Sequence, residues 1–163
     1  MTVDLTQKER SLLANQRNHE RLCVQKYNDY AGRASEQALQ ELFTGYGSQE
    51  RDHYNTISGL LQGESPHPAG PQGMLDAPDI PGIADSAGIL GKAGATTTNL
   101  QDATLCSDAL MTERFVSSSY DEAVFDSIDP ALRQALQHIQ QDEQRHGEGI
   151  LSYMRQNGMY IPE

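Results

Sequence analysis

The chain repeats itself after 93 positions, and this repeat constrains the fold more than any other feature. Glu20 corresponds to Glu113, and each is followed 30 residues later by a Glu-x-x-His sequence, at 50–53 and at 143–146. A repeat that keeps its register over such a distance predicts that two halves of the chain fold alike. Identical pairs at this spacing include Glu20/Glu113, Arg21/Arg114, Tyr27/Tyr120, Leu39/Leu132, Glu50/Glu143, His53/His146 and Ile57/Ile150.

Four segments carry apolar residues at every third or fourth position, which is typical of amphipathic helices. The first begins at a capping box, Thr6 to Glu9, and the fourth begins at Asp129-Pro130. The third begins near Thr98 or Asn99, and the fourth stops near 157–158. Gly45 and Gly47 inside the second helix indicate a bulge or a close helix contact.

Residues 63–98 are rich in Gly and Pro and follow no period. Such a segment is long enough to return the chain along the length of a bundle, and partial disorder or an interaction role are alternatives. We therefore predict an all-α, antiparallel four-helix bundle in a single domain, 1–163. Its parts are a hairpin at 6–62, a crossover at 63–98, a second hairpin at 99–157 and a short tail at 158–163.

Each half contributes one Glu from its first helix and a Glu-x-x-His pair from its second, one turn apart on one helix face. In a bundle these side chains would meet at one level, where four buried carboxylates without a cation would repel each other. Two divalent metal ions, iron or manganese, would resolve this repulsion, because this ligand set is that of carboxylate-bridged metal bundles. The candidate metal ligands are Glu20, Glu50, His53, Glu113, Glu143 and His146.

A lone Glu-x-x-His pair arises by chance on exposed helix faces, but two copies at matching offsets favour the metal site. The alternative is a bundle that descends from a metal protein and no longer binds metal. Tyr27 and Tyr120 lie two turns after Glu20 and Glu113, so their phenols are candidates to support carboxylate ligands from other helices. Ordinary core tyrosines are the alternative. Cys23 is interpreted as a small buried apolar residue.

Charge and composition exclude several classes of protein. The net charge is −11 and no cluster of Lys and Arg occurs, which argues against binding nucleic acid or an anionic membrane surface. No apolar run approaches the roughly 20 residues that span a bilayer. The N-terminus, MTVDLTQKER, lacks the apolar core of a signal peptide, and two cysteines make no disulfide framework. We expect synthesis in the cytoplasm.

The four-helix segments resemble the ferritin-like superfamily, through Glu20, Glu50-Arg-Asp-His53, Glu113 and Glu143-Gln-Arg-His146. Within it, the stretches HERLCVQKYNDYA (19–31) and LSYMRQNGMYIPE (151–163) resemble the Coat F spore-coat family. The resemblance implies a ferritin-like fold, a link to bacterial sporulation and deposition in the spore coat. It also implies reaction with peroxide or dioxygen, as in rubrerythrin-like relatives, where a tyrosine at the position of Tyr27 supports the ligands.

Two departures from the rubrerythrin pattern argue against a peroxidase of that type. Val116 stands where those proteins carry an extra carboxylate, and no Cys-x-x-Cys pair is present. Two hypotheses remain: a redox protein with a di-metal site, and a structural coat protein that contacts copies of itself or other coat proteins. Iron storage, a third, would need a large cage. Whether the chain is an enzyme stays open.

Overall fold

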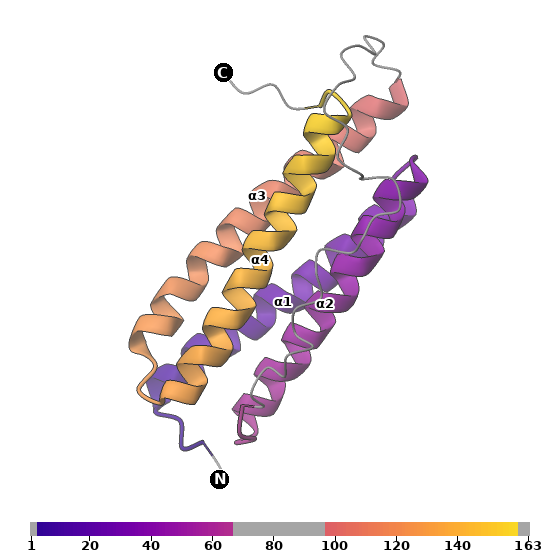
Figure 1. Ribbon diagram of the computed structural model, residues 1–163. Helices are drawn as coiled ribbons and strands as arrows, with labels where there is room; N and C mark the ends of the chain where they lie inside the picture. The colour runs from indigo at the N-terminus through magenta and orange to yellow at the C-terminus, as the bar shows by residue number, and fades with distance from the viewer. Residues whose placement is uncertain (1–2, 67–96, 160–163) are drawn as a thin grey trace.

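The computed structural model describes residues 3–66 and 97–159, and all regular structure within them is helical. The predicted crossover and tail lie mostly outside these ranges. The four helices, drawn in Figure 1, are α1 (Gln7–Arg33), α2 (Gln37–Leu61), α3 (Thr97–Asp126) and α4 (Pro130–Gln156).

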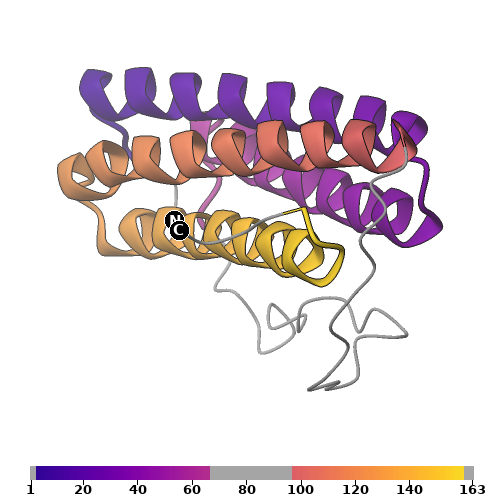
Figure 2. The same ribbon diagram turned by 90° about the horizontal axis from the view of Figure 1, so that it is seen from above.

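The helices pair as two antiparallel hairpins, α1 with α2 and α3 with α4, and the hairpins pack into one four-helix bundle (Figures 1 and 2). The α1 and α3 helices pack closely against each other, whereas α2 and α4 approach less closely. In Figure 1 the end of α2 and the start of α3 lie at opposite ends of the bundle. The predicted all-α bundle of two hairpins is confirmed.

The helices begin and end at the predicted capping residues or close to them. The Thr6 hydroxyl accepts from the Glu9 N–H, and the Glu9 carboxylate accepts from the Thr6 N–H, which completes the capping box. The Asp129 side chain accepts from two N–H groups in the first turn of α4. The third helix begins at Thr97, slightly before the predicted caps. After α4, Gly158 has a φ of +68°, which suits glycine and ends the helix.

Each hairpin uses a buried carboxylate to hold the turn of the other. In one direction, the Ser35 N–H donates to Asp102 Oδ1 at 3.0 Å, which ties the α1–α2 turn to α3. In the other, the Ile128 N–H donates to Glu9 Oε1 at 2.9 Å, which ties the α3–α4 turn to α1. Both pairs obey the 93-residue spacing, since Glu9 corresponds to Asp102 and Ser35 to Ile128. The contacts between the hairpins therefore have approximate two-fold symmetry.

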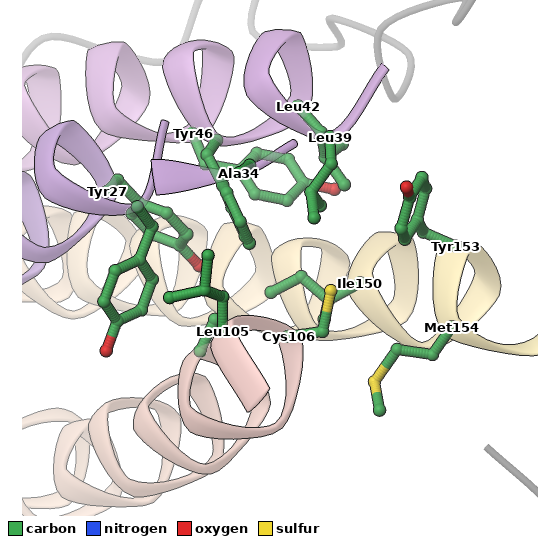
Figure 3. Packing of buried hydrophobic residues seen from close by; sticks show 13 residues of the cluster. Tyr27, Ala34, Leu39, Leu42, Tyr46, Leu105, Cys106, Ile150, Tyr153 and Met154 are labelled. Atoms are coloured by element: carbon green, nitrogen blue, oxygen red, sulfur yellow. The ribbon is translucent and has the colours of Figure 1, made fainter. Parts of the chain in front are cut away.

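The apolar core forms two clusters towards the two ends of the bundle. One, drawn in Figure 3, gathers side chains from all four helices, including Phe43, Leu105 and Ile150. The other contains Leu13, Val116, Leu132 and their neighbours. The predicted ligand residues belong to neither cluster, although they are buried. No helix in the described residues is both long enough and apolar enough to cross a membrane.

The two glycines inside α2 have different environments. A Cβ atom on Gly47 would lie 3.3 Å from Tyr27 Cβ and 3.3 Å from Asn28 Oδ1, so this glycine lies at a close contact between α1 and α2. A Cβ atom on Gly45 would meet no atom within 4 Å. The close helix contact expected from the sequence is therefore present at Gly47 and not at Gly45.

Candidate metal centre

Six predicted ligand residues meet in the interior of the bundle, with contributions from all four helices. Helices α1 and α3 each supply one glutamate, and α2 and α4 each supply a Glu-x-x-His pair, because a three-residue spacing places both side chains on the inward face. All six side chains are buried, and the most exposed residue, His53, is 6% exposed. They are Glu20, Glu50, His53, Glu113, Glu143 and His146.

The six residues form two overlapping groups that could each hold a metal ion. The ligand atoms within each group all lie within 4.8 Å of one another. Glu50 and Glu143 belong to both groups, so their carboxylates lie where a bridge between two ions would be needed. One group consists of Glu20, Glu50, His53 and Glu143, and the other of Glu50, Glu113, Glu143 and His146.

Both imidazoles turn Nδ1 towards the carboxylates. His53 Nδ1 lies 3.1 Å from Glu50 Oε2 and 3.0 Å from Glu143 Oε1. His146 Nδ1 lies 3.1 Å from Glu50 Oε1 and 3.4 Å from Glu113 Oε1. A single N–H cannot satisfy several surrounding oxygens, whereas a cation near Nδ1 could be shared by all of them.

Several carboxylate oxygens at this site have no hydrogen-bond donor. Glu20 Oε2, Glu113 Oε2 and both oxygens of Glu143 are buried and accept no hydrogen bond within the described residues. For Glu143 Oε1 this holds although His53 Nδ1 lies 3.0 Å away. Buried oxygens without donors are costly, and hard divalent cations are the partners that such oxygens bind well. The donor set therefore fits a metal ion.

Three of these groups, Glu50, Glu143 and His53, have raised pKa values, which favour neutral acids and a charged imidazole. Burial raises the pKa of Glu50 and of Glu143 well above its ordinary value, and the neighbouring carboxylates raise both further. Burial lowers the pKa of His53, but the nearby carboxylates, first those of Asp142 and Glu143, outweigh burial and hold this pKa well above the usual range. Metal binding would therefore displace protons and strengthen as the pH rises.

Two tyrosines connect the hairpins at the site. Tyr27 in α1 donates its hydroxyl to Glu113 Oε1 in α3, and Tyr120 in α3 donates to Glu20 Oε1 in α1. Burial and the nearby carboxylates raise the pKa of both phenols, so each keeps its proton and acts as the donor. Each tyrosine thus orients a carboxylate of the other hairpin.

Two contacts that the sequence analysis missed hold the outer ring nitrogens of the histidines. Asp142 Oδ2 lies 3.2 Å from His53 Nε2, and Gln49 Oε1 lies 2.5 Å from His146 Nε2. An oxygen acceptor at Nε2 favours the tautomer that leaves the Nδ1 lone pair free for a metal. Gln49 and Asp142 also correspond at the 93-residue spacing. Each carries a side-chain oxygen directly before a repeated ligand glutamate, and this shared position is the sequence signal that could have identified both residues.

Cys23 lies in the apolar cluster beside the carboxylates and is 1% exposed. Burial raises the pKa of its thiol far above the usual range, and the carboxylates of Glu50 and Glu143 raise it further. The thiol therefore stays protonated. This agrees with its interpretation as a small buried apolar residue.

Gly149 in α4 makes room for a tyrosine that packs on a candidate ligand. The Tyr46 ring lies 4.3 Å from the His146 ring, between centroids, and a Cβ atom on Gly149 would lie 1.9 Å from the Tyr46 hydroxyl oxygen. We expect Gly149→Ala to displace Tyr46 and to lower the free energy of unfolding by about 1–3 kcal/mol, measured by urea denaturation.

Gly45→Ala is the matched control for this substitution. Its Cβ would enter open space, so the better helix propensity of alanine should stabilise the protein by up to about 1 kcal/mol. Equal destabilisation by both substitutions would contradict a specific contact between Gly149 and Tyr46.

Comparison with known proteins supports the resemblance found in the sequence for the second hairpin. The Coat F domain family model matches residues 101–163, a range that includes most of α3 and all of α4. The match confirms the Coat F resemblance over this range, while the motif at 19–31 lies outside it. No curated protein matches the chain, and neither does any solved structure.

Proposed function

We propose that the chain is a ferritin-like spore-coat protein, a single domain that binds two divalent ions, iron or manganese, between its hairpins. The observation that carries this proposal is the pair of overlapping ligand groups with buried carboxylate oxygens that lack donors. The Coat F match supports the assignment to the spore coat. The arrangement agrees with the ligand set of carboxylate-bridged metal bundles, which gives two glutamates and two Glu-x-x-His pairs.

In this proposal each residue has one role. Glu50 and Glu143 would help to hold both ions, while Glu20 with His53, and Glu113 with His146, would each help to hold one of them. The phenols of Tyr27 and Tyr120 hold the carboxylates of Glu113 and Glu20 in place. Asp142 and Gln49 fix the histidine rings.

A bound pair of iron or manganese ions would supply redox chemistry with dioxygen or peroxide. The residues of this chain exclude bulk water from the centre, because all six candidate ligands are buried. Val116, where rubrerythrin-like proteins carry a further carboxylate, keeps one side of the centre apolar.

Metal analysis of the purified full chain tests the proposal. Protein from cultures supplemented with iron and manganese should carry about two equivalents of metal per chain after desalting. Less than about 0.1 equivalent, with no uptake after reconstitution of the chelated protein, would rule out the metal site. The unsubstituted chain unfolded in denaturant is the control for non-specific binding.

A structural coat protein is the second candidate, favoured by the Coat F match alone. Peroxide consumption separates the two functions, because a purely structural metal site would bind both equivalents without turning over peroxide. Fractionation of spores from a producing strain would test the coat assignment separately from the metal site.

A further inference from the structure

The outward face of α3 carries an unusual row of exposed apolar side chains. Leu100, Met111, Phe115 and Phe125 are between 59% and 84% exposed, and they account for four of the six large exposed apolar residues in the described part of the chain. At 100° per residue, these four residues and four of the exposed positions between them fall within about 80° of the helix circumference. We call this row the α3 stripe: Leu100, Thr104, Ser107, Met111, Phe115, Ser118, Glu122 and Phe125.

The internal repeat shows that the fold does not require an apolar face here. The equivalent positions on α1, 93 residues earlier, are also exposed but are mostly polar. They are Gln7, Ser11, Ala14, Asn18, Leu22, Gln25, Asp29 and Gly32. Of these, Leu22 is the single large apolar residue. The α3 stripe is therefore a property of one hairpin, and large exposed apolar patches mark contact surfaces.

The order of residues in the stripe is symmetric about its middle. Met111 and Phe115 lie at equal distances on either side of residue 113, and Leu100 and Phe125 are centred within one residue of the same point. The positions between them are polar on both sides. A surface with this symmetry complements a second copy of itself that runs in the opposite direction, as a two-fold dimer interface must.

Charge favours the antiparallel arrangement over the parallel one. Glu122 is the one ionisable residue in the stripe. In a parallel pair the two Glu122 carboxylates would face each other, but in an antiparallel pair each would lie opposite Thr104 of the other copy. At 1.5 Å per residue, the two carboxylates would then be about 27 Å apart along the helix axis, well beyond the screening length in physiological salt.

The area is sufficient for a specific contact. Since a large aromatic side chain buries roughly 150–250 Å², the four apolar residues offer on the order of 500 Å² per copy. Two copies would then bury about 1,000 Å², which is the lower limit for a specific interface, before any polar residue is counted. We infer that the chain forms a two-fold dimer in which the α3 stripes pack antiparallel, with Met111 against Phe115 and Leu100 against Phe125 of the second copy.

Sedimentation velocity of the full chain in about 0.15 M salt tests this inference, which does not depend on the metal site. We expect a dimer at micromolar concentration. Substituting Met111→Gln together with Phe115→Gln should raise the dissociation constant about a hundredfold, because each substitution occurs twice in a two-fold interface. Ile128→Gln removes an exposed apolar residue outside the stripe and should leave the dimer unchanged.

Cysteine cross-linking tests the direction of the helices and does not rely on the double substitution folding correctly. An equimolar mixture of Leu100→Cys and Phe125→Cys should give cross-linked pairs with a short bis-maleimide, whereas neither variant alone should. The native thiols of Cys23 and Cys106 are buried, so they should not react. Cross-linking of Leu100→Cys with itself would overturn the antiparallel arrangement.

Two other results would overturn the inference. A monomer at all concentrations up to about 100 μM would mean that residues 67–96 or another protein cover the stripe, since a contact of this area normally gives a measurable dimer. A dimer that resists the double substitution, while circular dichroism shows unchanged helix content, would place the interface on another face.

Discussion

Glu50→Gln is expected to abolish binding of both metal ions and, at the same time, to stabilise the metal-free protein. Glu50 belongs to both ligand groups, and its two oxygens face the two histidines at 3.1 Å each. Glutamine keeps the shape but provides one oxygen without a negative charge, so both ions would lose one of the two carboxylates that they would share. Metal per chain, measured by elemental analysis, should fall from about two equivalents to less than about 0.2.

The gain in stability has a separate cause. Burial and neighbouring carboxylates raise the pKa of Glu50, which means that its ionised form is costly in the folded protein. Removing this ionisable group should raise the free energy of unfolding of the chelated protein by about 1–2 kcal/mol, or roughly 3–6 °C in Tm. A general stabilising effect of removing one negative charge would appear equally in Glu41→Gln, an exposed position on the same helix.

Glu113→Gln tests whether Glu50 is needed for both ions. Glu113 belongs to one ligand group and Glu50 to both, so this variant should lose about one equivalent of metal instead of two. Normal metal content in Glu50→Gln would show that the ions bind elsewhere. Equal losses in the two variants would contradict the assignment of Glu50 as a bridge.

A second large effect is expected on pH dependence. The metal-free protein should become less stable as the pH rises above about 5. Glu50, Glu143 and His53 have raised pKa values in the folded state. Such groups stabilise the fold fully at pH below their unfolded pKa, about 4.3 for Glu and 6.5 for His. That stability is lost as the pH rises through the folded pKa. The folded state binds these protons more tightly than the unfolded state does, so losing them costs the folded state more free energy.

We expect the Tm of chelated protein to fall by about 3–10 °C between pH 5.5 and pH 8, which corresponds to roughly 1–3 kcal/mol. The lowered pKa values of Glu113 and Asp142 have the opposite sign, but they act below about pH 4.5, outside this window. Metal-loaded protein should show the reverse trend, since ions compete with protons for the same oxygens.

General repulsion between surface acids could also lower the Tm with rising pH, because the net charge is −11. Glu143→Gln and Glu41→Gln change the net charge equally, so they separate the two causes. Glu143→Gln should reduce the slope of Tm against pH, whereas Glu41→Gln should leave it nearly unchanged. Parallel slopes in all three proteins would mean that the buried acids do not control the pH dependence.

The positions of the six candidate ligands could be predicted because their chemistry is preserved in both halves of the chain. The three-residue spacing of Glu50 and His53 fixes a helix face locally, and its recurrence at Glu143 and His146 requires no knowledge of tertiary structure. The helix caps at Thr6 and Asp129 were predictable for a different reason, which is that capping depends on local sequence alone.

Contacts between residues of different hairpins could not be predicted from the sequence in this way. Gln49 and Asp142 occupy equivalent positions but differ in residue type, as do Glu9 and Asp102, so identity alone did not single them out. Their partners depend on how the hairpins are offset along the bundle axis. Similarly, the sequence could not distinguish Gly47, at a helix contact, from other glycines, because helix propensity does not report what lies opposite.

The reciprocal carboxylates that hold the two turns have a consequence for assembly. A single hairpin would leave its own turn without the carboxylate that caps it, and it would hold half of the charged centre with nothing opposite. Asp102 and Glu9 therefore make the ordering of each turn depend on the docking of the other half. The two hairpins therefore resemble complementary fragments that are covalently joined, and we expect neither to fold stably without the other.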